Sequence, residues 1–154
     1  MIEGRAVSRR GVPGEMWLRV RVLVDEEITY ANRPPLASMA ELIDLVRAEP
    51  RLLRFVVGRY RRLVGQEALA ACWLALVLGE ARRRAADEVL LESLGRHDVL
   101  HDEAVAAGLI RRADVLFERV VGELECEVDQ HRRGWLYEIL EAGCGALARR
   151  QAQG

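Results

Sequence analysis

The sequence predicts a mainly α-helical protein, in which a short N-terminal β-hairpin precedes a compact bundle of five or six helices. Two observations favour this fold class. After residue 35, apolar residues recur three and four positions apart along most of the chain, as in amphipathic helices. Before it, every second residue of the stretch 17–24 is apolar from Leu18 to Val24, which is typical of a half-buried strand.

The chain of 154 residues fits a single domain. Hydrophobic residues make up 51% of it and charged residues 31%, a composition that favours a folded core over disorder. Residues 1–15 are polar and glycine-rich, and we expect them to form a flexible N-terminal arm. Residues 16–154 are then a single helical domain that includes the hairpin.

The predicted hairpin uses residues 17–24 as its first strand, residues 25–27 as the turn and residues 28–30 as a short return strand. Pro34 and Pro35 stop this strand, because proline lacks the amide that a sheet needs. An isolated two-stranded hairpin is marginally stable in water. The hairpin must therefore pack on the helices or pair with another chain.

Two helices are expected after the prolines. Ser38 and Glu41 have the spacing of a capping box, so the first helix should start at about residue 39 and run to Ala48. Pro50 suits the first turn of the second helix, because its missing amide would have no partner there. This second helix covers residues 50–64 and carries one apolar stripe.

The longest predicted helix covers residues 66–95, and we expect the bundle to be organised around it. Its first half, residues 68–78, is apolar on every side, so other parts of the protein or a partner chain must surround it. Its second half is charged and should be solvated. Opposite charges four residues apart predict three ion pairs there: Glu80 with Arg84, Arg84 with Glu88, and Arg83 with Asp87.

Three further helices are predicted in the last third of the chain. Residues 98–107 form a short helix, or the first part of a longer one that is interrupted at Gly108. Residues 109–131 form a strongly amphipathic helix. Gly134 separates it from a last helix over residues 135–150.

The residue inventory excludes several chemistries. All 23 basic residues are arginine, so no Schiff-base lysine and no phosphate-loop lysine is present. The three cysteines, Cys72, Cys126 and Cys144, form no CxxC pair, which favours a reducing, cytoplasmic location over a disulfide scaffold. The longest uncharged stretch, residues 68–79, is far shorter than the roughly 20 residues of a membrane span. We expect no cofactor and no membrane partner.

The histidines give an incomplete pattern for a metal site. His97 and His101 lie four residues apart, and Glu127 and His131 repeat that spacing. A metal site needs three or four converging ligands, and neither HExxH nor the paired ExxH of di-iron bundles occurs. No metal site is predicted, and the two pairs stay open candidates.

Two charged faces are the predicted binding surfaces. The face of the 50–64 helix is basic and the face of the 109–131 helix is acidic. The basic face is a candidate for nucleic-acid phosphates, or for the acidic face of the same or a neighbouring molecule. A formal net charge of -1 and the lack of interleaved aromatic residues favour a protein partner. The residues are Arg51, Arg54, Arg61 and Arg62 on the basic face and Glu118, Glu125 and Asp129 on the acidic face.

A possible catalytic pattern lies at residues 96–101, RHDVLH, which has the form RxxxxH. It resembles the motif of HEPN-type ribonucleases, small helical bundles in which the arginine and histidine lie near a dimer interface and cleave RNA without a metal. The resemblance implies that Arg96 stabilises phosphate charge and that His101 acts as acid or base on the 2′-hydroxyl. The chain departs from common members at Asp102, where an aromatic residue often follows the histidine.

Residues 99–121 also resemble a helix-turn-helix, with Ala104 and Gly108 four residues apart. Arg111 and Arg112 would then enter a DNA groove. A simple helix break at Gly108 explains the same residues.

We therefore predict a non-enzymatic helical module for protein–protein interaction or assembly, which self-associates as a homo-oligomer. The apolar central helix, the hairpin that needs a partner and the complementary charged faces all favour this function. The first alternative is the metal-independent ribonuclease, and the second is a DNA-binding regulator.

Overall fold

The computed structural model describes residues 11–66 and 68–153, and these residues form eight α-helices and no strand. The mainly α-helical class is confirmed, whereas the hairpin is wrong and the number of helices is higher than predicted. A π-helical segment continues α1, and a short 3-10 helix precedes α3. The elements are α1 (Gly14–Val22), the π-helix (Leu23–Ile28), α2 (Leu36–Ala48), the 3-10 helix (Pro50–Leu52), α3 (Leu53–Leu63), α4 (Ala68–Ala81), α5 (Arg84–Ser93), α6 (Val99–Arg111), α7 (Ala113–Cys126) and α8 (Gln130–Gln153).

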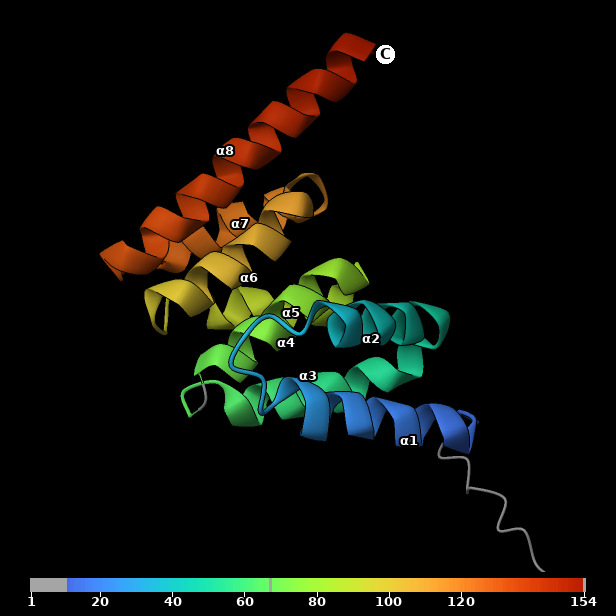
Figure 1. Ribbon diagram of the computed structural model, residues 1–154. Helices are drawn as coiled ribbons and strands as arrows, with labels where there is room; N and C mark the ends of the chain where they lie inside the picture. Colours follow the sequence, from blue (N-terminus) through green and yellow to red (C-terminus); the bar gives the residue numbers. More distant parts are fainter. Residues whose placement is uncertain (1–10, 67, 154) are drawn as a thin grey trace, which may run out of the picture.

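Helix α4 is the centre of the fold, as the sequence predicts. It packs against α2, α3, α5 and α6 of the same chain, with α1 and α3 on one side of it and α6 on the other (Figure 1). Its residues Leu74, Val77 and Leu78 have no exposed surface. The apolar helix is therefore enclosed by its own chain and needs no partner for burial.

The N-terminal stretch predicted as a hairpin is helical. Val20, Val24 and Ile28 lie four residues apart and are fully buried, which is the period of a helix rather than of a strand. Leu18, which should share the buried face of a strand, is 57% exposed. Alternating valines fit both periods, and in the structure the helical period brings Val20, Val24 and Ile28 into the core. Of the predicted N-terminal arm, residues 1–10 lie outside the described residues, while Val12 is buried in the core.

Helix α2 begins earlier than predicted and does not use the capping box. Pro35 occupies its N-cap position, so Ser38 lies inside the helix and makes no cap hydrogen bond. The Glu41 carboxylate instead accepts a hydrogen bond from Arg19 Nη2 of α1, at 2.7 Å. The predicted end at Ala48 and the position of Pro50 in the first turn of the next element are confirmed.

The predicted helix 66–95 is two helices. The chain breaks between α4 and α5 at Arg82, whose φ of +53° is rare for a residue with a side chain. The three predicted ion pairs across this stretch are wrong, because the carboxylates turn to other helices. Glu80 pairs with Arg47 at 3.3 Å, Asp87 with Arg112 at 2.9 Å, and Glu88 with Arg119 at 3.2 Å.

Two glycines predicted as breaks lie inside helices. Gly108 is in α6, where it crosses Gly79 of α4 so closely that a Cβ on Gly79 would lie 2.7 Å from the Gly108 Cα atom. Gly134 is in α8. The actual end of α7 is followed by Asp129, whose side chain accepts a hydrogen bond from the Arg132 amide at 3.0 Å and so caps α8. The predicted bounds of the 109–131 helix are therefore wrong, because the helical residues of this stretch belong to α6, α7 and α8.

The crossing predicts that Gly79→Ala destabilises the protein by about 1–3 kcal/mol, because α4 and α6 must move apart to admit a methyl group. The matched control is Gly58→Ala in α3, where nothing lies within 4 Å of the added atom. There the same change should stabilise the fold by about 0.5–1 kcal/mol through helix propensity. Urea unfolding measures both, and equal stability of the two variants would contradict the crossing.

Candidate functional site

Of the five buried polar or charged residues in the described part of the chain, four gather where α5 ends and α6 begins. Charged side chains are rarely buried unless they are paired. A cluster of buried polar and charged residues therefore makes this region a candidate functional site. The fifth, Asp87, makes its ion pair with Arg112 elsewhere. The four residues are Ser93, His101, Asp102 and Arg132.

Arg132 of α8 holds the end of α5. Its Nε donates to the Leu94 carbonyl at 3.0 Å and its Nη2 donates to the Leu91 carbonyl at 2.7 Å. The carbonyls at a helix C-terminus lack helical partners and carry partial negative charge, so a cation suits them. The remaining Nη1 donates to the Glu127 carboxylate at 2.7 Å, which balances the buried charge.

Asp102 of α6 holds the next turn of the chain. Its Oδ1 accepts from the Gly95 amide at 3.0 Å, and its Oδ2 lies 3.4 Å from His131 Nε2. Gly95 has a φ of +71°, and a Cβ there would lie 2.8 Å from the Arg132 Cα atom. Glycine is therefore required both by conformation and by space. Arg132 and Asp102 together fix the loop of residues 94–97 from two sides.

His101 joins this loop to α3. Its Nε2 lies 2.6 Å from the Tyr60 hydroxyl, which lies 2.7 Å from the Ser93 hydroxyl. Its Nδ1 is buried without a hydrogen-bond partner, 3.8 Å from Asp102 Oδ1. Burial, and then the neighbouring His97, lower the pKa of His101 despite Asp102. Burial also raises the pKa of the Tyr60 phenol. Both groups are thus held in their neutral forms near pH 7.

A cleft of about 460 Å³ lies between α3 and α5, on the outer side of this hydrogen-bonded group. Arg61 of the predicted basic face and Arg96 of the RxxxxH pattern both line it. Tyr60 and Ser93, which are almost fully buried, are among the residues of its wall. The full lining is Tyr60, Arg61, Val64, Val89, Glu92, Ser93, Arg96 and His97.

The two residues of the RxxxxH pattern have different surroundings. Arg96 is exposed, and its Nε donates to the Glu92 carbonyl at 2.7 Å. His101 is 1% exposed and does not line the cleft, whereas its neighbour His97 does. A role for His101 in RNA cleavage would require Tyr60 or His97 to move aside. The ribonuclease function stays a prediction.

The predicted basic and acidic faces lie on α3 and α7, which are on opposite sides of the α4–α6 layer (Figure 1). Arg54 and Arg62 are exposed, while Arg51 forms an ion pair with Glu49 at 2.7 Å and Arg61 lies 3.6 Å from Glu92. On the acidic side, Glu118 and Glu125 are exposed and Asp129 is the cap of α8.

The arginines of the helix-turn-helix pattern are both paired within the chain. Arg111 contacts the Glu80 carboxylate, and Arg112 donates to Asp87. Gly108 between α4 and α6 explains the small residue that the pattern requires at this place. DNA binding by this segment stays a prediction.

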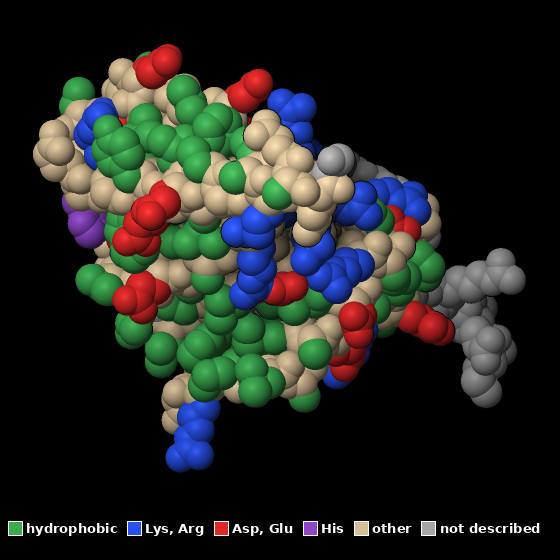
Figure 2. Space-filling view, turned by 90° about the horizontal axis from the view of Figure 1, so that it is seen from above, with side chains coloured by type: hydrophobic (Ala, Val, Ile, Leu, Met, Phe, Trp, Pro, Cys, Tyr) green, Lys and Arg blue, Asp and Glu red, His purple; other side chains and the backbone are tan. Residues whose placement is uncertain are grey.

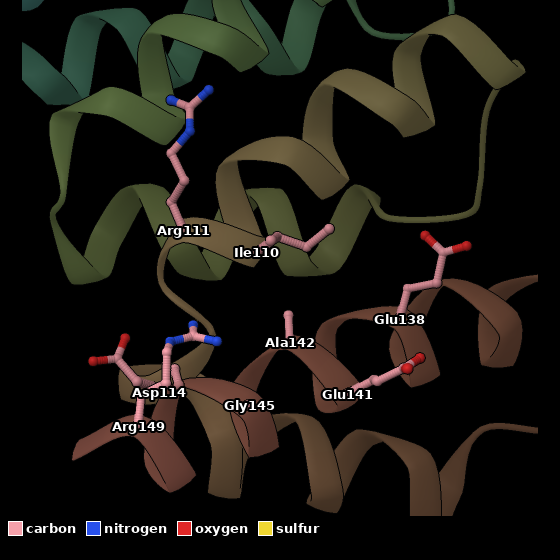
Figure 3. Close-up of a pocket in the computed structure, with 9 residues that line it drawn as sticks. Ile110, Arg111, Asp114, Glu138, Glu141, Ala142, Gly145 and Arg149 are labelled. Atoms are coloured by element: carbon pink, nitrogen blue, oxygen red, sulfur yellow. The ribbon is translucent and has the colours of Figure 1, made fainter. Parts of the chain in front are cut away.

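A second concave surface lies between α8 and the junction of α6 with α7. It is a groove of about 850 Å³, with Ile110 and Arg111 on one side and a row of α8 residues on the other (Figure 3). This row is not among the predicted binding surfaces, although its spacing of three and four residues in the last helix is a signal in the sequence. The lining residues are Ile110, Arg111, Asp114, Glu138, Glu141, Ala142, Gly145, Ala146 and Arg149.

Comparisons with protein-family models, curated proteins and solved structures find no match to this chain. No helix in the described part of the chain is long and apolar enough to span a membrane. Among the same residues, no group of three or more histidine, cysteine or acidic side chains is arranged to hold a metal ion.

The buried His101 predicts a loss of stability in acid. Its folded-state pKa lies below the ordinary value of 6.5, so only the unfolded chain takes up the proton as the pH falls from there towards the folded-state pKa. Stability is then full above that ordinary value and is lost at up to about 1.4 kcal/mol per pH unit below it. The groups facing His101 are Tyr60, His97, Asp98 and Asp102.

The check is urea unfolding of wild type and His101→Gln at about pH 7 and about pH 5. Glutamine can keep a hydrogen bond to Tyr60 but does not titrate, so the variant should lose less stability on acidification. An equal loss in both proteins would contradict the assignment to His101.

If Arg96 and His101 act as the HEPN resemblance implies, the purified protein cleaves single-stranded RNA and His101→Ala abolishes that cleavage. Glu125→Ala, an exposed change on α7 outside the motif, is the control and should keep the activity. The measurement is gel analysis of a labelled RNA in the presence of a metal chelator. Absence of cleavage by the wild type, or unchanged cleavage by His101→Ala, would remove this function.

Proposed function

We propose that the protein is a non-enzymatic helical assembly module that self-associates through α8. A self-complementary row of charges along the groove face of this helix carries the proposal. Glu138 and Glu141 stand at one end of the row and Arg149 at the other, with Ala142 and Gly145 between them (Figure 3). A second copy in the opposite direction would place each charged end against the other.

The register of such a pair follows from the numbering. When two α8 helices run antiparallel with Ala142 of one opposite Gly145 of the other, Glu138 of each lies opposite Arg149 of its partner. The two charges are eleven residues apart, or about 16 Å along a helix. The central alanine and glycine leave room for close approach of the two backbones. Such a pair uses the same surface on both copies and closes as a two-fold dimer.

The charges of this row are available for a partner. Glu138, Glu141 and Arg149 have no ion-pair partner among the residues that the structure describes, whereas other charges at the groove are paired: Arg111 contacts Glu80, and Arg150 contacts Asp114. Complementary unpaired charges contribute to the choice and register of a partner more than to folding.

The C-terminal turns of α8 are only partly covered by their own chain. The helix has 24 residues, and the last buried one that the structure describes is Gly143, next to the Ala113 carbonyl of α7. The helix then projects past α7 (Figure 1). Helices gain most of their stability from packing of one face, so a second copy on these turns would stabilise them.

The surface around the groove has the mixed character of a protein-binding face. Seen from the side of α7 and α8, hydrophobic side chains form patches with arginines and carboxylates between them (Figure 2). Ile110, Val115 and Tyr137 of α6, α7 and α8 are exposed large hydrophobic residues. Apolar patches with a charged rim are typical of association surfaces.

Helix α8 supports self-association, whereas the three features that favour it in the sequence do not. The central helix is covered by its own chain, and no hairpin needs a partner within the described residues. The helices that carry the basic and the acidic face, α3 and α7, lie on different sides of α4 and α6 (Figure 1). Such faces would join copies head to tail and produce chains, whereas the α8 row closes on itself.

A charge-exchange experiment tests the dimer. Glu138→Arg alone places arginine opposite arginine, and Arg149→Glu alone places glutamate opposite glutamate, so each variant should be monomeric at concentrations where the wild type is dimeric. An equimolar mixture restores two opposite-charge contacts and should form heterodimers. Sedimentation velocity at low ionic strength measures the species, because screening weakens such contacts.

Glu125→Arg, an exposed change on α7 away from the groove, is the control and should dimerise like the wild type. A wild type that stays monomeric up to high concentration would refute the proposal. So would a mixture of the two variants that associates no more than either variant alone.

A further inference from the structure

The cleft between α3 and α5 places two guanidinium groups from different elements beside one cavity. Arg61 belongs to α3 and Arg96 to the loop after α5. The carboxylate on the lining is Glu92, which lies 3.6 Å from Arg61 with 72% of its side chain exposed. An ion pair as exposed as this contributes little. A more highly charged anion can therefore displace the Glu92 carboxylate from Arg61 with little loss of free energy.

The cationic loop is held in place before any ligand arrives. Arg96 Nε donates to the Glu92 carbonyl at 2.7 Å, and the guanidinium charge also interacts electrostatically with the Glu127 and Asp129 carboxylates. A phosphate in the cleft would compete with these two carboxylates for Arg96. Behind it, Asp102 holds the Gly95 amide and Arg132 holds the Leu94 carbonyl. Such support lowers the ordering cost of binding, because the charged group is already in position.

The burial of Arg132 and Asp102 is hard to explain by stability alone. Taking both charges out of water costs free energy that a well-packed apolar pair would not require. Their hydrogen bonds go to the loop of residues 94–97 and to the end of α5, which form one wall of the cleft. These buried charges therefore fix the position of the cleft wall, at a cost in folding free energy.

The remaining lining suits the organic part of a small molecule. Val64 and Val89 are the aliphatic residues of the lining, and Tyr60 and Ser93 belong to its wall with their hydroxyls hydrogen-bonded to each other. The volume of about 460 Å³ is within the range of small-molecule sites, roughly 300–1,000 Å³. A macromolecular chain would need a longer surface than this cleft offers.

We infer that this cleft binds a small organic phosphate monoester, with the phosphate between Arg61 and Arg96 and the organic group against Val64 and Val89. Guanidinium forks match phosphate oxygens in pairs, and two of them balance a dianion. The inference is independent of the proposed dimer, since the cleft and the α8 groove are built from different residues.

Isothermal titration calorimetry with phenyl phosphate at low ionic strength tests the site. Arg61→Gln and Arg96→Gln should each weaken binding about tenfold or more, because each removes charge-assisted hydrogen bonds. Arg62→Gln, one residue along α3 and outside the cleft, is the matched control and should bind like the wild type. Glu92→Gln should bind more tightly, since it removes the competing carboxylate, and a gain of affinity cannot arise from misfolding.

Inorganic phosphate should bind more weakly than phenyl phosphate, because it lacks the group that contacts the two valines. No binding of phenyl phosphate by the wild type would overturn the inference. An equal loss in Arg62→Gln would overturn it too, since the attraction would then be a general property of the basic face. Benzoate binding as tightly as phenyl phosphate would contradict the phosphate as the recognised group.

Discussion

The contact between Gly79 of α4 and Gly108 of α6 is the constraint on which the rest of the structure depends. With no side chain on either helix at this point, the two backbones approach to van der Waals distance. Helix α6 is thereby fixed against the central apolar helix. Its first turn carries His101 and Asp102, and its last turn leads into α7 and α8. The position of both candidate sites follows from this one crossing.

Arg132 links these two sites. It lies in the first turn of α8, yet its guanidinium holds the carbonyls at the end of α5 beside the cleft. The later turns of the same helix carry the charged row of the groove. Removing one member of a buried, paired group costs about 3–5 kcal/mol because the other is left uncompensated. Arg132 and its buried partners thus hold both the cleft wall and the start of α8 in place.

The sequence predicts an element correctly where its residue pattern fits only one kind of structure. The all-round apolar residues 68–78 identified the central helix, and the apolar stripe of residues 50–64 gave α3 with Leu53, Val56 and Tyr60 buried. It was misleading where a pattern had two meanings. Val20 and Val24 fit both a strand and a helix. Gly108 was interpreted as a break although glycine also allows close helix contact, and for Gly134 inside α8 the structure shows no close neighbour.

Other features have no local signal. The break at Arg82 occurs without glycine or proline, between Glu80 and Asp87, which form ion pairs with Arg47 and Arg112. Arg61 and Arg96 were each recognised as candidates, but only the fold brings them to one cleft. Arg132 and Asp102 look in the sequence like ordinary surface charges. Burial of a charge depends on partners from distant segments, which periodicity does not reveal.

We propose that the body of the protein is complete in one chain, while the end of α8 is completed by a second copy. Backbone hydrogen exchange at a low and a high protein concentration tests it most directly. We expect amides of α4 to exchange slowly at both concentrations, and those of the last turns of α8 to exchange quickly in the dilute sample and slowly in the concentrated one. Exchange in these last turns that is equally fast at both concentrations would contradict the account.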